Sequence, residues 1–320
     1  MKAIVRSQYG SPDVLRLQDI DRPEPGDDEI MVRVHAASVN PYDWHMMTGL
    51  PYLARLSAGL RRPRNPVLGA DVAGRVEAVG RDVTWCRAGD EVFGQAEGGY
   101  AEYACLRGDR AAFKPPSLTY EQAAALPIAG VTALQALRDS GRIRTGQRVL
   151  VNGAGGGVGT FAVQIAVSYG TTVTGVCGTG NVELVRSLGA DDVLDYTKDD
   201  IPRAGDYDLI LDLVGNRPLR DWRRALRPTG SYVAVGAPKH GQWIGPLVFV
   251  AKVLLMSLAG RRMVPMLATL TRDDLNVLAT LVSAGKVTPV IDRAFPLAAV
   301  AAALEHIGTG HARGKVVITV

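Results

Sequence analysis

A glycine-rich loop carries the clearest chemical signal of the chain. Five glycines fall within residues 153–159, after the apolar run 149–151 and before apolar residues at helical spacing in 161–166. A strand–turn–helix unit of this kind binds the pyrophosphate of a dinucleotide, because glycine lets the backbone approach the phosphates and the helix N-terminus offers free N–H groups. We expect the pyrophosphate to be contacted, mainly through the backbone, by Ala154, Gly156, Gly157, Val158 and Gly159.

The residues after this helix favour one form of the cofactor. Residues 171–176 are typical of a second strand, which completes a βαβ unit. Sites for NAD usually carry Asp or Glu at the end of this strand, where the carboxylate bonds the ribose 2′-hydroxyl. Residues 177–181 read Cys-Gly-Thr-Gly-Asn, so no carboxylate is there to repel a 2′-phosphate, and a hydroxyl and an amide could bond to it. On this ground we expect NADPH rather than NADH, although the loop holds no Arg or Lys to pair with the phosphate.

Composition excludes several classes of protein. The 320 residues are 47% hydrophobic and 21% charged, as in a globular protein with room for two domains. A net charge of +4 gives no indication of a nucleic-acid partner. Three widely spaced cysteines suit a reducing compartment, and the N-terminus lacks a signal-peptide core, so we expect a cytoplasmic protein. The apolar stretch 244–258 is shorter than the roughly 20 residues that span a bilayer, which predicts a buried helix or cleft wall and no membrane partner.

The pattern of elements predicts two kinds of domain. Short β-rich runs separated by Gly and Pro indicate a mostly β domain over residues 1–120, with strands at 3–5, 29–37, 69–79, 91–94 and 98–105. From residue 121 onward, helices (121–125, 132–139, 161–168) alternate with strands (149–152, 173–176, 192–195, 209–213, 232–235), which is typical of a doubly wound parallel sheet. We place this α/β domain at 121–270.

The tail predicts a return to the first domain. Residues 271–320 contain two helical patterns, 275–284 and 298–307, and a closing strand, 315–320. The fold class is therefore α/β, with a doubly wound Rossmann sheet inserted into a mostly β domain. Within the inserted domain, Arg220, Arg223, Arg224 and Arg227 follow helical spacing, and we interpret them as a solvated basic face of one helix.

Six separate motifs, in order, resemble the medium-chain dehydrogenase/reductase superfamily, and within it the zinc-independent quinone oxidoreductase (zeta-crystallin-like) branch. They are Asn40-Pro41-Tyr42-Asp43 and the segments 69–76, 89–94, 154–159, 188–191 and 310–317. The resemblance covers essentially the whole chain. It implies that the mostly β domain is GroES-like, and that two copies of the chain pair as a homodimer through an edge strand at 262–266.

The departures from the zinc-dependent alcohol dehydrogenases of this superfamily concern the metal. Positions that match their three catalytic zinc ligands carry Asn40, Ala70 and Ile128, and the four cysteines of their structural zinc site are missing. We therefore expect no zinc. Without a Lewis acid, oxidation of a simple alcohol is difficult, whereas hydride addition to a quinone or an α,β-unsaturated carbonyl needs less assistance. The resemblance implies this second reaction class and a small-molecule substrate.

The resemblance also implies roles for individual residues. It places Thr179, Asn181 and Tyr196 at the adenosine end of the cofactor, and Thr132, Val214 and Gly236 near the nicotinamide. It places Asn40 where the zinc enzymes have a ligand, so that its amide would stabilise an enolate oxygen. Residues close to Asn40 in sequence are expected to line or close the substrate pocket; they are Tyr42, Asp43, Trp44 and Tyr52. Each residue has a structural alternative: Thr132 can bond its own helix backbone, Asn40-Pro41 can form a turn, and Asp43 can cap a helix.

Three functions follow from these expectations. The first is an NADPH-dependent, zinc-free oxidoreductase acting on a quinone or an enone. The second is an NADPH-binding redox sensor or interaction protein without turnover, since a fold does not by itself define a function. The third is a metal-free alcohol or aldehyde oxidoreductase, which would reduce NADP⁺ in the presence of alcohol.

Overall fold

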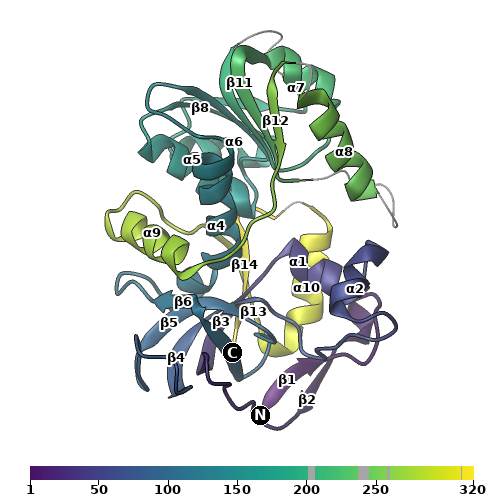
Figure 1. The fold of residues 1–320 in the computed structure, drawn as a ribbon, viewed down its shortest axis with the longest axis vertical. Coiled ribbons are helices and arrows are strands. Elements are labelled where there is room, and N and C mark those ends of the chain that lie inside the picture. Colours follow the sequence, from purple (N-terminus) through teal and green to yellow (C-terminus); the bar gives the residue numbers. More distant parts are fainter. Residues whose placement is uncertain (201–205, 237–244, 258–259, 311) are drawn as a thin grey trace. The chain divides into compact units, whose positions relative to one another are not determined.

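The structure is a computed structural model that describes the chain except for residues 201–205, 237–244, 258–259 and 311. The chain divides into two compact units (Figure 1). Unit 1 consists of Met1–Val131, Leu270–Gly285 and Pro289–Val320, and unit 2 of Thr132–Thr269 with Lys286–Thr288. Each unit has its own six-stranded sheet, which positions the residues of interest.

Unit 1 is built on a mainly antiparallel sheet in the order β13-β14-β3-β4-β5-β6, and an added β3–β6 pairing closes the last four strands into a ring. Its strands are β3 (Glu29–Val39), β4 (Asp71–Val79), β5 (Glu91–Ala96), β6 (Tyr103–Phe113), β13 (Ile291–Pro296) and β14 (Lys315–Thr319). A separate hairpin joins β1 (Lys2–Val5) to β2 (Arg16–Asp19). Ile30, Val32 and Val34 alternate along β3 with more exposed residues and lie in the core of this unit.

The helices of unit 1 are short. They are α1 (Pro41–Thr48), α2 (Arg55–Ala58), α3 (Tyr120–Ala124), α9 (Arg272–Ser283) and α10 (Val300–Gly308), and α4 (Pro127–Gln135) continues from unit 1 into unit 2. The closing strand β14 pairs antiparallel with β3 and parallel with β13. This pairing places Lys315, the first residue of β14, next to the end of β3, where α1 begins.

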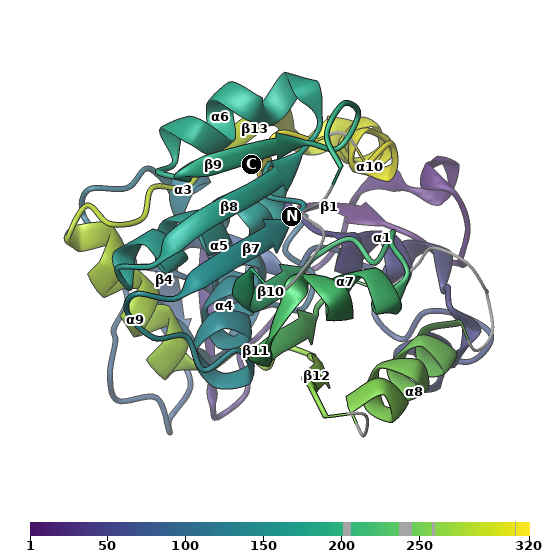
Figure 2. The same cartoon turned by 90° about the horizontal axis from the view of Figure 1, so that it is seen from above.

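Unit 2 is the predicted doubly wound parallel sheet. Its strands are β7 (Arg148–Asn152), β8 (Thr172–Cys177), β9 (Asp192–Asp195), β10 (Tyr207–Asp212), β11 (Leu226–Ala234) and β12 (Arg262–Pro265). They are all parallel, in the order β9-β8-β7-β10-β11-β12 that Figure 2 shows across the sheet. From β7 the chain adds β8 and β9 on one side, and then returns to add β10, β11 and β12 on the other side of β7. The strand order therefore reverses beside β7, and ligands of such sheets bind at this switch point.

Four helices accompany this sheet: α5 (Gly157–Ser168), α6 (Val182–Ser187), α7 (Leu219–Ala225) and α8 (Gly245–Ser257). Val149, Leu150 and Val151 of β7 are completely buried, as expected for a central parallel strand covered on both faces. The predicted edge strand exists as β12, which ends at Pro265.

Several predicted elements have different bounds. The strand expected at 98–105 begins only at Tyr103, because the N–H groups of Gly98 and Gly99 both bond to the carbonyl of Gly69 in a turn. The helix expected at 132–139 begins at Pro127, since proline suits the first turn of a helix, and continues as a π-helix over Ala136–Ser140. Strands β2 and β13 were not predicted.

The predicted four-arginine helix face is wrong. Helix α7 ends at Ala225, and Arg227 lies on β11, where its guanidinium pairs with Asp208 at 2.9 Å. Within α7 itself, Trp222 and Ala225 are buried in the core of unit 2.

Within the apolar stretch 244–258, whose two end residues lie outside the described residues, Gly245–Ser257 form helix α8, which is only partly buried and lines one wall of a groove. Val253 lies in the core of unit 2, whereas Leu254 and Leu255 on the opposite side are 52% and 65% exposed. In the described part of the chain, no helix is both long and apolar enough to cross a membrane.

Candidate functional site

The glycine-rich loop forms a cradle at the centre of the sheet in unit 2. It connects β7 to α5, and Gly153 turns the chain with a φ of +90°. A Cβ on Gly159 would lie 2.1 Å from the carbonyl oxygen of Gly153, so only glycine allows this approach of helix and loop. A Cβ on Gly156 would meet nothing closer than 3.5 Å, which leaves open space at the N-terminus of α5. This open space beside free N–H groups suits a phosphate.

The residues expected at the adenosine end do come together beside this loop. A Cβ on Gly155 would lie 2.7 Å from the side chain of Asn181, and a Cβ on Gly178 would lie 3.1 Å from the hydroxyl oxygen of Tyr196. The Oδ1 atom of Asn181 is buried and has no hydrogen-bond partner among the described residues. A buried oxygen without a partner calls for an explanation, and a hydroxyl of a bound ribose would supply the missing donor. The residues present therefore fit a dinucleotide.

Asp195 is a further polar residue at this end that sequence reasoning missed. Its carboxylate accepts hydrogen bonds from the hydroxyl of Thr179 (2.6 Å) and from Thr197, and it lies 3.3 Å from Nζ of Lys198. These donors, Thr179 first, lower the pKa of Asp195 far below its usual range. The signal was present in the sequence: Asp195 ends a predicted strand, and adjacent parallel strands bring their carboxyl ends to one edge.

The carboxyl ends of β10 and β11 hold the loop expected near the nicotinamide. Asp212 is completely buried and accepts hydrogen bonds from Nδ2 of Asn152 (2.8 Å), the N–H groups of Val214 (3.1 Å) and Gly215 (2.9 Å), and the hydroxyl of Tyr232 (2.8 Å). This carboxylate fixes the loop in place. Sequence reasoning missed it, although a carboxylate at the end of an apolar strand is an unusual feature.

The three predicted nicotinamide residues lie in different settings. A Cβ on Gly236 would lie 2.7 Å from the backbone nitrogen of Val214, so the two predicted positions are neighbours. The side chain of Val214 is exposed. Thr132 lies in α4 and is nearly buried. Their contact with a cofactor stays a prediction.

Unit 1 contains a buried polar cluster around Asn40. Its amide Nδ2 donates to Oδ2 of Asp71 (3.0 Å) and weakly to the carbonyl of Ser38 (3.5 Å), and its Oδ1 accepts from Nζ of Lys315 (2.6 Å). Asp71 also accepts from the hydroxyl of Ser38 (3.1 Å) and the N–H of Ile128 (3.2 Å). The four side chains of this cluster are at most 3% exposed; they belong to Ser38, Asn40, Asp71 and Lys315. Burial lowers the pKa of Lys315, and Asp71 opposes this effect.

Asp43 and Tyr42 differ sharply in exposure. Asp43 is buried in the first turn of α1 and accepts the N–H of Asn40 at 2.8 Å, as a helix-capping carboxylate does. Burial raises the pKa of Asp43 to about 7, although the bond from Asn40 opposes this rise. The nearby hydroxyl of Tyr100 also opposes this rise in the pKa of Asp43. Tyr42, by contrast, is 47% exposed. The structure thus brings Asn40 and Asp43 into one cluster and leaves Tyr42 at the surface.

The positions that match zinc ligands do not fit a zinc ion. Ala70 and Ile128 have no donor in their side chains, and both ends of the Asn40 amide are bonded to protein groups. The described residues contain no group of three or more His, Cys, Asp or Glu that could hold a metal ion.

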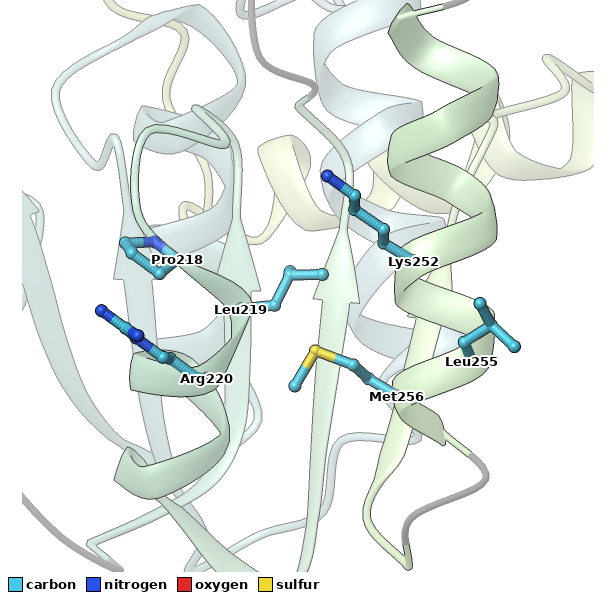
Figure 3. A pocket seen from close by; sticks show the side chains of 6 residues that line it. All are labelled: Pro218, Leu219, Arg220, Lys252, Leu255 and Met256. Carbon is cyan, nitrogen blue, oxygen red and sulfur yellow. The ribbon is translucent and has the colours of Figure 1, made fainter.

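A groove of about 370 Å³ lies between α7 and α8 (Figure 3). It is lined by Pro218, Leu219, Arg220, Lys252, Leu255 and Met256. The lining is mainly apolar, and its two polar side chains are both cations. None of the described lining residues is a carboxylate or a hydroxyl that could form an acid–base pair with them.

Comparison with protein families gives two matches that together cover most of the chain. Residues 26–117 match the alcohol dehydrogenase GroES-like domain. Residues 188–318 match a family described as zinc-binding dehydrogenase. The first match lies within unit 1, and the second includes β9 to β14.

Individual relatives resemble the chain over its whole length. The human mitochondrial protein named NAD(P)H oxidoreductase RTN4IP1 is 35% identical, over 100% of this chain and 89% of its own. The structure of the quinone oxidoreductase from Coxiella burnetii superimposes with a TM-score of 0.87 at 34% identity, covering 100% of this chain and 99% of that one. A mycobacterial protein solved in complex with NADPH has a TM-score of 0.83 at 26% identity and 100% coverage of both chains.

Proposed function

The chain belongs to the medium-chain dehydrogenase/reductase superfamily, in its quinone oxidoreductase-like branch, and is an NAD(P)H-dependent enzyme of that type; we propose that it uses NADPH to reduce a quinone or an α,β-unsaturated carbonyl without a metal ion. The cofactor binds unit 2, and residues of unit 1 act on the substrate.

One observation carries this choice of substrate class. Where zinc enzymes of the superfamily hold a Lewis acid, this chain has Asn40, Ala70 and Ile128, which do not form a ligand set. Alcohol oxidation depends on acidification of a hydroxyl, which this place does not provide. An enone or a quinone is already an electrophile, so hydride addition needs only hydrogen bonds to the oxygen that gains negative charge.

The bound cofactor supplies a hydride from C4 of its nicotinamide ring. When hydride adds to the β-carbon of an enone, the C=C pair would form the new double bond of an enolate, and the C=O pair would move onto the oxygen. The amide N–H of Asn40 would donate to this oxygen, and a proton from water would then reach the α-carbon, or the oxygen when the substrate is a quinone. Asp43 holds the backbone of Asn40 through its 2.8 Å hydrogen bond. The exposed side chain of Tyr42 lines the substrate region.

Two features support NADPH over NADH. Residues 177–181 hold no carboxylate, and the ammonium of Lys198 balances the Asp195 carboxylate that Thr179 bonds, which leaves a donor near Thr179. A phosphate oxygen is a strong acceptor for such a donor. In this proposal the pyrophosphate lies on Gly156, Gly157 and Val158, and the adenosine end contacts Thr179, Asn181 and Tyr196. The nicotinamide ring is bordered by Val214, Gly236 and Thr132.

The test is oxidation of NADPH, followed at 340 nm with a chelator present, against quinones, enones, aldehydes and alcohols. We expect oxidation that depends on a quinone or an enone and survives chelation, and slower turnover with NADH. Loss of activity on chelation, with recovery on added Zn²⁺, would contradict the metal-free reaction. NADPH binding without any turnover would favour a sensor, and alcohol-dependent reduction of NADP⁺ would favour a metal-free alcohol oxidoreductase.

We further propose a homodimer and a cytoplasmic location. Strand β12 (Arg262–Pro265) is the last strand of its sheet among the described residues, and an open edge can pair with the same edge of a second copy. Light scattering of the purified protein measures the mass of the assembly, and a monomer would overturn the first proposal. Cell fractionation tests the cytoplasmic location. The human relative is named as mitochondrial, and recovery of this protein in a membrane-enclosed compartment would contradict the proposal.

A further inference from the structure

The geometry points to Lys315 as a positioning residue for the substrate reaction: its buried ammonium polarises the amide of Asn40 and strengthens the N–H that this amide offers to the substrate oxygen. The inference rests on the proposed function, because it concerns the oxygen on which charge develops. It gives the last strand of the chain a part in catalysis, although Lys315 would not itself touch the substrate.

The ammonium group of Lys315 makes its shortest contact with the side-chain amide of Asn40. Its Nζ lies 2.6 Å from Oδ1 of Asn40, 3.3 Å from the carbonyl of Val39 and 3.8 Å from Oδ2 of Asp71. The shortest contact is therefore with the neutral amide and not with the carboxylate. The side chain is 3% exposed, so water does not screen this charge. A cation bonded to an amide oxygen draws electrons from the amide nitrogen and makes its N–H a stronger donor.

The two N–H groups of Asn40 are held unequally. One donates to Asp71 at 3.0 Å, whereas the contact with the carbonyl of Ser38 is 3.5 Å, at the limit of a hydrogen bond. The second N–H is therefore the one that a substrate oxygen can take over at little cost. A donor that is already oriented in a dry site stabilises a developing charge without reorganisation.

Asp71 makes the buried lysine possible. The carboxylate balances its charge and receives Ser38, Ile128 and Asn40 as donors, so the cluster is held on three sides. A lone buried ammonium would lose its proton or destabilise the fold. The pair also ties β14 to the end of β3. A purely structural role is thus the competing explanation, and the test has to separate the two.

The test compares Lys315→Met, Lys315→Arg and the double variant Asp71→Asn/Lys315→Met with the wild type. The double variant replaces a buried ion pair by neutral groups of similar size, a change that often preserves stability. Lys2→Met, at an exposed lysine paired with Asp19, is the matched control. Each protein is assayed with a series of aryl vinyl ketones whose ring substituents change the charge on the enolate oxygen, and NADPH affinity and thermal unfolding are measured in parallel.

We expect the double variant to unfold and bind NADPH like the wild type, yet to lose roughly 10- to 100-fold in kcat, below the loss of 10²–10³ found when an oxyanion donor itself is removed. KM should change little, and log kcat should depend more steeply on the substituent. Lys315→Arg should recover part of the rate. Wild-type kcat in the folded double variant, or an unchanged slope, would overturn the inference while the proposed function stands. A wild-type protein that binds NADPH but reduces no quinone or enone would overturn both.

Discussion

The hydroxyl of Thr179, in the loop after β8, donates a 2.6 Å hydrogen bond to the carboxylate of Asp195 at the end of β9. This bond joins two neighbouring strand ends at the place where the adenosine of a dinucleotide is expected. Lys198 completes the arrangement, since its Nζ lies 3.3 Å from the same carboxylate. Residues 177–181 contain no cation, so in the proposed NADPH site the positive charge near a 2′-phosphate comes from Lys198 in the next strand–loop connection.

Lys198→Gln therefore tests the preference for NADPH. The lysine is largely exposed, and an exposed charge pair contributes about 1 kcal/mol, so we expect NADPH to bind roughly fivefold more weakly. NADH lacks the 2′-phosphate, and its affinity should not change. Fluorescence titration with both cofactors measures the two effects. Arg186→Gln, at an exposed arginine paired with Glu183 on α6, controls for loss of surface charge. Equal weakening of both cofactors would contradict the assignment.

Two glycine positions separate folding from cofactor binding. Gly159→Ala should destabilise unit 2 by several kcal/mol or prevent folding, because its Cβ would lie 2.1 Å from a backbone oxygen. Gly156→Ala meets no atom within 3.4 Å and has an ordinary φ of −85°, so it should unfold like the wild type. If the pyrophosphate fills this space, Gly156→Ala should weaken NADPH binding at least about tenfold, which is 1.4 kcal/mol. Titration and thermal unfolding give the two readouts. Unchanged affinity in Gly156→Ala would show that the phosphates lie elsewhere.

The buried carboxyl of Asp43 predicts a pH dependence of stability. Its pKa rises from 3.8 to about 7 on folding, mainly through burial. Between these values the unfolded chain has lost the proton and the folded chain keeps it. The stability that this group contributes is thus present below pH 4 and is lost as pH rises toward 7.

Asp43→Asn removes this titration while keeping an oxygen that can accept the N–H of Asn40. We expect the free energy of unfolding of the variant, relative to the wild type, to rise by roughly 2 to 3 kcal/mol between pH 5 and pH 7 and then to level off. Urea unfolding at several pH values measures this difference. A difference that stays constant with pH would mean that Asp43 is ionised throughout.

Local patterns were sufficient to predict the glycine-rich strand–turn–helix of unit 2. The glycines of 153–159, the apolar residues of β7 and the spacing along α5 lie within some twenty consecutive residues, and each element follows from its own period. The predicted ends of helices and strands were wrong where contacts with distant residues determine them. Gly98 and Gly99 turn toward Gly69, and Arg227 leaves the helical pattern to pair with Asp208.

The buried polar clusters could not be predicted in the same way, because their members are distant in sequence. Asn40 and Lys315 are 275 residues apart, and Asn152 and Asp212 are 60 apart. Only the pairing of β14 with β3, and of β10 with β7, brings them together. The sequence did contain a hint, since Lys315 and Asp212 each adjoin an apolar strand where a charge requires a partner. The identity of that partner depends on sheet order and register.

Asp212 predicts the effect of removing the carboxylate that fixes the loop after β10. Asp212→Ala leaves the N–H groups of Val214 and Gly215 without their acceptor, and it also removes the acceptor of the Tyr232 hydroxyl and one of the two acceptors of the Asn152 amide. A buried donor without a partner costs about 1–3 kcal/mol. We therefore expect a loss of roughly 3 kcal/mol or more in the free energy of unfolding.

Asp212→Asn is the matched variant, because its Oδ1 can still accept from Asn152 and the two N–H groups, while the hydroxyl of Tyr232 can accept from its Nδ2. Asp212→Asn should therefore lose much less stability than Asp212→Ala. If the loop bounds the nicotinamide, Asp212→Ala should also raise KM for NADPH at a temperature where it is fully folded, and Asp212→Asn should not. Urea unfolding and steady-state kinetics of both variants measure the two effects. Equal loss of stability in both variants would mean that the charge of Asp212, and not its hydrogen bonds to the loop, stabilises this edge of the sheet.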